Sequence, residues 1–161
     1  MAEAYGVFLR EFIDAGEEGV LFNFSGDVDD PAGLIRQLQN HREGFDVPGG
    51  LVPCTAYWLL GEDGGLIGEI HIRHSLTPAL EDYGGHIGYM VRPQQRRRGY
   101  ATRMLALALE KARGIGLRGV MVTCEPGNIG SARVAQKNGG KLISETVGRI
   151  GRPTSRYWIE L

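Results

Sequence analysis

An arginine-rich turn is the part of this sequence whose residue types and spacing most clearly suggest chemistry. In the stretch "RPQQRRRGYATRML", Arg96 to Arg98 stand directly before Gly99, where a predicted strand passes into a predicted helix. The first backbone amides of a helix have no partner within it, and the helix dipole adds partial positive charge there. Gly99 and the small Ala101 allow an anion to approach the backbone. The turn therefore predicts a phosphate or pyrophosphate site, although three arginines alone also fit a solvated basic surface.

Two common phosphate motifs do not fit this turn. A Walker loop requires a lysine followed by serine or threonine after its second glycine, and a dinucleotide fingerprint requires Gly-x-Gly-x-x-Gly after a first strand. The turn has neither arrangement. The two cysteines also lack metal-ligand spacing, so we expect free thiols and no metal site.

The elements that must position this turn alternate between helices and strands. We predict helices over Glu3–Ala15, Asp29–Glu43, Thr102–Arg113 and 131–138, and strands over 55–60, 66–73, 85–91, 119–124, 141–148 and 154–161. Apolar residues with a period of 3.6 make the third helix the clearest, and "GEDGG" predicts a hairpin between the first two strands. This order indicates an α/β (α+β) class, with a mixed sheet carrying helices on its faces in one domain over residues 1–161.

Composition and charge narrow the function classes. The 161 residues are 42% apolar and 23% charged, and no stretch approaches the roughly 18 apolar residues of a membrane span. The N-terminus does not resemble a signal peptide, so we expect a cytoplasmic protein with no membrane partner. Residues 1–85 carry fifteen acidic and four basic side chains, whereas residues 86–161 carry four acidic and fourteen basic ones. The basic half lacks an array of aromatic residues for stacking bases, which disfavours nucleic acid as a partner.

The turn and its flanks resemble the central motif of the GCN5-related N-acetyltransferases. That family follows a strand and a proline with Arg/Gln-x-x-Gly-x-Gly/Ala, and here the motif is Arg96-x-x-Gly99-x-Ala101. The resemblance continues in "VMVTCEPGNIGSARVAQKNGGKL", where Asn128 and Ser131 match the family's Asn-x-x-Ser/Ala. It implies the acyl-CoA N-acyltransferase fold, a mostly antiparallel central sheet splayed between its fourth and fifth strands. It also implies acetyl-CoA as the acetyl donor.

The resemblance assigns positions to the donor. Backbone amides over residues 97–102 would hold the pyrophosphate, and the strand ending at Val91 would pair with the pantetheine arm as if it were an added strand. An amide near Met90 or Val91 would stabilise the tetrahedral oxyanion. The full set of expected donor-binding residues is Met90, Val91, Arg96, Arg97, Arg98, Gly99, Tyr100, Ala101, Thr102, Asn128 and Ser131.

Two residues are candidates for the base that deprotonates an attacking ammonium. His86 stands where many family members carry a glutamate before "IGY", and a histidine titrates near neutrality. Glu69 is the second candidate, because a carboxylate on a core face of a strand needs a partner. Glu125, at the end of the predicted strand 119–124, is a weaker one. The alternatives are a strand-end hydrogen bond for His86 and ordinary strand patterning for Glu69.

The acid that protonates the leaving thiolate is less clear. The family often uses a tyrosine seven residues after the asparagine, and here that position is Ala135. Ser131 or a water molecule could replace it, and Tyr89 and Tyr100 are further alternatives.

Together these residues predict an acetyl-CoA-dependent N-acetyltransferase. It would act on a primary amine of a small molecule or peptide, by direct attack in a ternary complex. The acidic half would wall the acceptor pocket and favour a cationic amine. The alternative is a non-catalytic acyl-CoA-binding sensor or structural homologue. A homodimer is common for this fold, and the first strand of the family is expected to be absent or very short.

Overall fold

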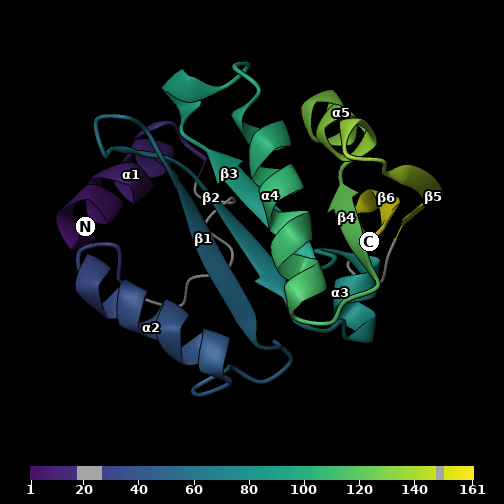
Figure 1. The fold of residues 1–161 in the computed structure, drawn as a ribbon, viewed down its shortest axis with the longest axis horizontal. Coiled ribbons are helices and arrows are strands. Elements are labelled where there is room, and N and C mark those ends of the chain that lie inside the picture. Colours follow the sequence, from purple (N-terminus) through teal and green to yellow (C-terminus); the bar gives the residue numbers. More distant parts are fainter. Residues whose placement is uncertain (18–26, 148–150) are drawn as a thin grey trace.

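The computed structural model describes residues 1–17, 27–147 and 151–161 (Figure 1). Its helices are α1 (Ala2–Asp14), α2 (Pro31–Glu43), α3 (Pro78–Asp82), α4 (Tyr100–Gly114) and α5 (Ile129–Lys137). Its strands are β1 (Cys54–Leu60), β2 (Leu66–Arg73), β3 (Ile87–Val91), β4 (Gly119–Cys124), β5 (Lys141–Val147) and β6 (Pro153–Glu160). A short 3-10 turn, η2 (Pro93–Gln95), joins β3 to the start of α4.

The six strands form one sheet in the order β1-β2-β3-β4-β6-β5. All neighbours are antiparallel except β3 and β4, which are parallel and share a single registered pair, Ile87 with Val122. Beyond that pair the two strands diverge, although each remains paired along its other edge. The mixed sheet and its helices confirm the predicted fold class. The opening between β3 and β4 corresponds to the splay expected between the family's fourth and fifth strands, because no strand precedes β1 in the described residues.

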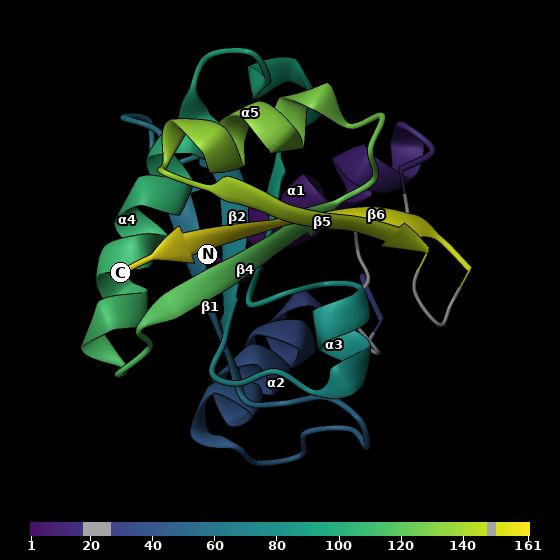
Figure 2. The same ribbon diagram turned by 90° about the vertical axis from the view of Figure 1, so that its right-hand side faces the viewer.

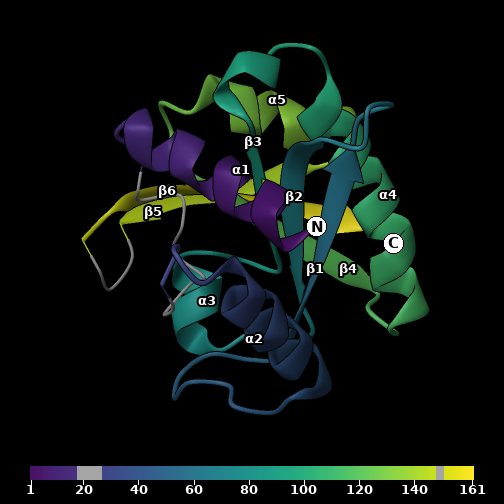
Figure 3. The same cartoon turned by 90° about the vertical axis from the view of Figure 1, so that its left-hand side faces the viewer.

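Two apolar clusters hold helices on opposite faces of this sheet. Ile70, Ile87 and Val122 belong to the cluster that contains the buried face of α4, which includes Met104 and Leu105. The second cluster packs α1 and α2 against the other face (Figure 3), with its buried members Tyr5, Phe8, Leu9, Phe12, Leu34, Leu66 and Met90. Helix α5 lies beside β6 at the far end of the sheet (Figure 2). The gap between β3 and β4 thus has helices on both sides.

Local capping explains where several helices begin. The Asp30 carboxylate accepts the Gly33 amide at 2.9 Å, and Pro31 opens α2 as its first residue. Asn128 caps α5 by accepting the Ser131 amide at 3.0 Å. Because that amide belongs to the third helical residue, α5 begins at Ile129, two residues before its predicted start.

Other element boundaries differ from the prediction in small ways. Helix α4 begins at Tyr100 instead of Thr102, because Gly99 is already its N-cap. Helix α3 was not predicted, although Thr77 caps it by accepting the Leu80 amide and Pro78 opens it. Residue 148, the predicted end of the β5 strand, lies outside the described residues. In the described part of the chain no strand precedes β1.

Two global properties follow from the described residues. No helix among them is long and apolar enough to cross a membrane. Cys54 and Cys124 are both free thiols, as the sequence predicts.

Candidate active site

A cavity of about 980 Å³ opens where β3 and β4 diverge. One wall is the whole of β3, Ile87–Val91, together with Thr123 and Cys124 at the end of β4 and Glu125, which follows the strand. The turn before α4 and the first residues of α4, Gly99 to Thr102, form the second wall, and α5 forms the third. The sequence-predicted donor residues therefore gather around one space, with the exception of Arg98, which does not line it.

The turn before α4 exposes a run of backbone amides. The first backbone bond of this helix is donated by Arg103 to the Gly99 carbonyl at 3.1 Å. In the described structure no hydrogen bond occupies the amides of residues 97–102. Arg97 and Gly99 both have left-handed backbones, with φ values of 62° and 84°. Such alternation turns successive amides toward one concave surface, which is a common anion-binding geometry. A Cβ added at Gly99 would have no heavy atom within 4 Å, so the backbone is open at this position.

The side chains of the arginines in this turn divide into two groups. Arg96 donates from Nε to the Val91 carbonyl at 3.1 Å and pairs through two nitrogens with the Glu17 carboxylate at 2.8 and 2.5 Å. This hydrogen bond lowers the pKa of Glu17 and raises that of Arg96. Arg92 likewise pairs with Glu11 of α1 at 2.8 Å. These two arginines anchor the turn to the α1 side. Arg96 and Arg97 both line the cavity.

Hydroxyl groups from β3 and α5 meet at the cavity wall. The Tyr89 hydroxyl lies 2.7 Å from Ser131 Oγ, and both residues line the cavity. Burial raises the pKa of Tyr89 to about 12, so its hydroxyl keeps its proton at neutral pH. Ala135, at the position of the family's usual tyrosine, is fully buried in the core. Tyr89 and Ser131, the two alternatives to that tyrosine in the sequence, therefore form one hydroxyl pair at the cavity wall.

His86 is engaged in holding β3 to β4. Its backbone amide donates to the Met121 carbonyl at 2.8 Å, and its ring Nδ1 accepts the Met121 amide at 2.9 Å. Burial, and then the positive charge of Arg73, lowers the pKa of this ring, which favours the neutral form that such a bond requires. His86 does not line the cavity.

Glu69 is also separated from the cavity. Its side chain is fully buried on the α1 and α2 face, where it accepts a hydrogen bond from Trp58 Nε1 and pairs with His71. Neither Glu69 nor His71 lines the cavity. Glu69 is registered opposite Met90 of β3, but neither Glu69 nor His86 lines the cavity, and their catalytic roles stay sequence-based hypotheses.

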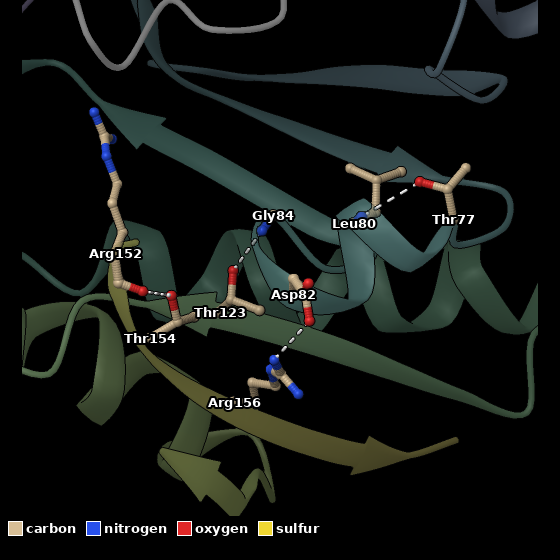
Figure 4. Close-up of polar contacts among 8 residues, drawn as sticks. All are labelled: Thr77, Leu80, Asp82, Gly84, Thr123, Arg152, Thr154 and Arg156. Atoms are coloured by element: carbon tan, nitrogen blue, oxygen red, sulfur yellow. Dashed lines mark hydrogen bonds and ion pairs between the residues drawn. The ribbon is translucent and has the colours of Figure 1, made fainter. Parts of the chain in front are cut away.

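The loop carrying α3 closes the other side of the gap (Figure 4). The Thr123 hydroxyl accepts the Gly84 amide at 2.9 Å, and Arg156 of β6 pairs with Asp82 at 3.1 Å. Arg73 donates to the Gly84 and Gly85 carbonyls, each at 3.0 Å. These bonds tie the loop to β2, β4 and β6.

This anchored loop contributes to the cavity and comes close to the sheet. Leu80 and Tyr83 line the cavity from the loop. Gly85 has a φ of 61°, and a Cβ there would lie 2.5 Å from the Met121 carbonyl oxygen, so only glycine fits. The sequence predicted no element between the strands over residues 66–73 and 85–91, and these anchors were not foreseen. The Thr-Pro helix start and the paired glycines were the available signals.

Glu125 is the carboxylate that directly follows β4, which ends at Cys124. Val120, Val122 and Cys124 face the α4 cluster, so alternation along β4 turns Thr123 to the α3-loop side. Glu125 is exposed and lines the cavity. The other carboxylate in the described cavity wall, Glu17, is held by Arg96.

Comparison with known proteins gives this geometry a family. A family profile described as "Acetyltransferase (GNAT) domain" matches residues 25–141. The chain belongs to the GNAT acetyltransferase family. This confirms the resemblance seen in the sequence and, at the level of the family, the prediction of an acetyltransferase. A search of curated proteins finds no match.

Solved structures of other proteins share the fold. A GNAT-family acetyltransferase from Bacillus anthracis has a TM-score of 0.66 at 16% identity, covering 99% of this chain and 88% of its own. RimJ from Mycobacterium smegmatis, in complex with CoA-disulfide, has a TM-score of 0.70 at 17% identity, covering 99% and 78%. The yncA protein of Salmonella typhimurium, solved with its cofactor acetyl-CoA, has a TM-score of 0.64 at 17% identity, covering 99% and 89%. At these identities the likeness concerns the fold, and the expectation of acetyl-CoA as donor is consistent with the family.

Proposed function

We propose that this protein is an acetyl-CoA-dependent N-acetyltransferase that acts on a primary amine of a small molecule or peptide. The observation that carries the proposal is the row of unoccupied amides over residues 97–102, at one end of a cavity that runs along β3 into the gap beside β4. The left-handed Arg97 and Gly99 aim that row at one anion. The pyrophosphate of acetyl-CoA would occupy it, with Arg97 adding formal charge.

The pantetheine arm would then follow β3. Because β3 and β4 share only one registered pair, the edge of residues 88–91 that faces β4 has no strand partner in the described chain. An extended arm can add to such an edge through backbone hydrogen bonds. The thioester would lie near Met90 and Val91, where a backbone amide would stabilise the oxyanion.

The acceptor would enter from the α3-loop side. Glu125 lines the cavity as an exposed carboxylate, so it can attract an ammonium and receive a proton from it. The free amine attacks the thioester carbonyl, a C–N bond forms, and the C–S bond of the collapsing intermediate breaks. The departing thiolate takes a proton from the pair of hydroxyls formed by Tyr89 and Ser131, and the pair regains it from the nitrogen of the intermediate, which must lose a proton to become the amide.

Calorimetric titration with acetyl-CoA tests the donor half of this proposal. We expect wild-type protein to bind with a dissociation constant on the order of micromolar. Gly99→Glu places a carboxylate in the amide row and should weaken binding at least about 100-fold, which is about 2.7 kcal/mol. Gly99→Ala is the matched control, because it adds the same backbone strain without the charge and should cost less than about tenfold. Wild-type protein that does not bind acetyl-CoA would refute the proposal.

An amine screen with detection of released thiol tests the acceptor half. We expect turnover with at least one primary amine, and Glu125→Gln should lower the rate more than His86→Gln or Glu69→Gln do. Binding of acetyl-CoA without turnover would instead favour a non-catalytic acyl-CoA sensor, the function that Ala135 in place of the family's tyrosine would permit.

A further inference from the structure

A group of apolar side chains lines the cavity outside the set of residues proposed to bind the donor. Leu51 comes from the loop between α2 and β1, and Leu80 and Tyr83 come from the anchored α3 loop. The two apolar clusters of the described chain contain none of the three. Leu80 is buried and Leu51 is 46% exposed, so these side chains are part of the cavity wall and not of the core. Such a wall suits a ligand with an apolar group.

The α3 loop holds this apolar wall next to the end of β4. The Thr123 hydroxyl accepts the Gly84 amide, and Arg156 of β6 pairs with Asp82 (Figure 4). Glu125 follows two residues after Thr123 and lines the same cavity. An apolar wall and an exposed carboxylate therefore border one space, so one ligand can meet both.

The charges around the cavity indicate how many ammonium groups that ligand carries. Two carboxylates line the cavity among the described residues, Glu17 and Glu125, and Arg96 holds Glu17 with two hydrogen bonds. Within this described wall, Glu125 is thus the carboxylate that remains for an ammonium. The basic side chains of the same wall are Arg73, Arg96, Arg97, Arg133 and Lys137.

Two cations lie directly at the α3 loop. Arg73 is buried, lines the cavity and donates to the Gly84 and Gly85 carbonyls. The Arg152 guanidinium lies 5.8 Å from the centre of the Tyr83 ring. A second ammonium on the acceptor would therefore be placed against apolar side chains and close to like charges, and both surroundings disfavour a charged group.

We propose that the acceptor is an amine with a single positive charge and an apolar chain. Its ammonium meets Glu125, and its chain lies on Leu51, Leu80 and Tyr83. This inference rests on the proposed acetyl transfer and narrows its acceptors, because it excludes polyamines and aminoglycosides, which carry several ammonium groups. The reaction yields the N-acetyl amide and the free CoA thiol, and the proton taken up by Glu125 passes to solvent. A small monoamine and a peptide N-terminus with an apolar first residue both have this chemistry.

A matched pair of amines tests the charge. Hexylamine and hexamethylenediamine have the same carbon chain and differ by one ammonium. We expect wild-type protein to acetylate hexylamine with a kcat/KM at least about tenfold higher, because the second charge of the diamine would lose its water. Equal values, or a preference for the diamine, would overturn the proposal. Leucyl-glycyl-glycinamide distinguishes the two sources: a higher kcat/KM than that of hexylamine assigns the site to peptide N-termini, and a lower one to small monoamines.

The substitution Leu51→Glu tests the apolar wall. We expect kcat/KM to fall about fivefold for hexylamine, which loses apolar contact, and to rise about threefold for the diamine, which gains a carboxylate. Leu107→Glu is the matched control, because Leu107 of α4 is also 46% exposed but does not line the cavity. It should change neither value by more than about twofold. Parallel changes for the two amines in Leu51→Glu would contradict the proposal. If this variant no longer binds acetyl-CoA, the wild-type pair decides alone.

Binding measurements separate this inference from the proposed acetyl transfer. Hexylamine and hexamethylenediamine are titrated into protein saturated with CoA, which has no acetyl group to transfer. Tighter binding of hexylamine supports the apolar site even where no amine is acetylated, a result that would overturn the transfer alone. Equal binding of the two amines, or binding of neither, would overturn the apolar site, and acetylation of any other amine would then leave the acetyl transfer intact.

Discussion

The turn before α4 and the inner face of β2 both concentrate charge, but they do so in opposite surroundings. In the turn, Arg97 and Arg98 extend from a surface loop, and the unoccupied amides are the feature that suits an anion. On β2, Glu69, His71 and Arg73 are buried and satisfied by specific partners. Charged residues in a sequence can therefore mark either a ligand site or an internal network, and their burial distinguishes the two.

Ion pairs in these two surroundings also differ in how much they contribute to stability. An ion pair at the surface contributes about 0 to 1 kcal/mol, because water screens it and the side chains lose entropy. Removing one partner of a buried pair costs about 3–5 kcal/mol, because the other charge is left without compensation. Substitutions in β2 should therefore change stability, whereas substitutions in the turn should change donor affinity.

The largest effect is expected for Glu69→Gln. This substitution leaves His71 without its carboxylate in a fully buried position, so we expect the free energy of unfolding to fall by about 3 kcal/mol. Urea unfolding followed by circular dichroism measures it. Glu125→Gln is the matched control on an exposed carboxylate and should change stability by less than about 0.5 kcal/mol. Equal effects of the two substitutions would show that the β2 network is not held by this charge.

The next largest difference between β2 and the turn before α4 should be in the pH dependence of stability. The folded pKa of His71, about 10, lies above its unfolded value, so its stabilising contribution is complete below about pH 6.5. It is then lost as the pH rises through about 10, because the unfolded chain binds fewer protons than the folded one. Urea unfolding at several pH values between 6 and 10 should show this decline in wild-type protein. The double variant Glu69→Gln with His71→Gln should decline less over the same range, and a parallel decline would disprove the linkage.

Much of the fold could be predicted from the sequence, because its signals are local. The period of 3.6 in α4, the turn between β1 and β2, and the Asn128 cap each act within a few residues. The amide row was predictable for the same reason, since the glycine at position 99 and the helix that follows it define the backbone. Helix α3 was missed because its five residues are too few to show a helical period, although Thr77 and Pro78 signalled it.

The roles of individual side chains could not be predicted in this way. Whether His86 faces a cavity or accepts the Met121 amide depends on how β4 lies beside β3, which is set by contacts far apart in the sequence. Arg96 was grouped with the donor site by its motif position, yet its guanidinium bonds to Glu17, 79 residues away. Tyr89 and Ser131, which are 42 residues apart in the sequence, likewise meet only in the folded chain.

A moderate effect is expected when the arginines of the turn are changed one at a time. Arg97 lines the cavity and Arg98 does not, so Arg97→Ala should weaken acetyl-CoA binding about fivefold and Arg98→Ala about twofold or less. The difference should shrink as salt is raised from about 0.05 M to 0.5 M, because screening acts on exposed charges. Calorimetric titration at the two salt concentrations measures both variants. An equal, salt-independent loss would mean that the side chains act through folding instead of through the donor's phosphates.

The smallest effect should come from Glu17→Gln. This substitution tests whether Arg96 binds the donor or only holds the turn in place. The substitution removes the charged partner of Arg96 but leaves the bond from Arg96 Nε to the Val91 carbonyl. If Arg96 only supports the turn, acetyl-CoA affinity should fall by less than about threefold and stability by less than about 1 kcal/mol. Arg96→Ala loses both bonds and should cost more in each measurement. If Glu17→Gln instead strengthened binding, the released guanidinium would be reaching the pyrophosphate. Arg96 would then resemble Arg97 more than the buried charges of β2.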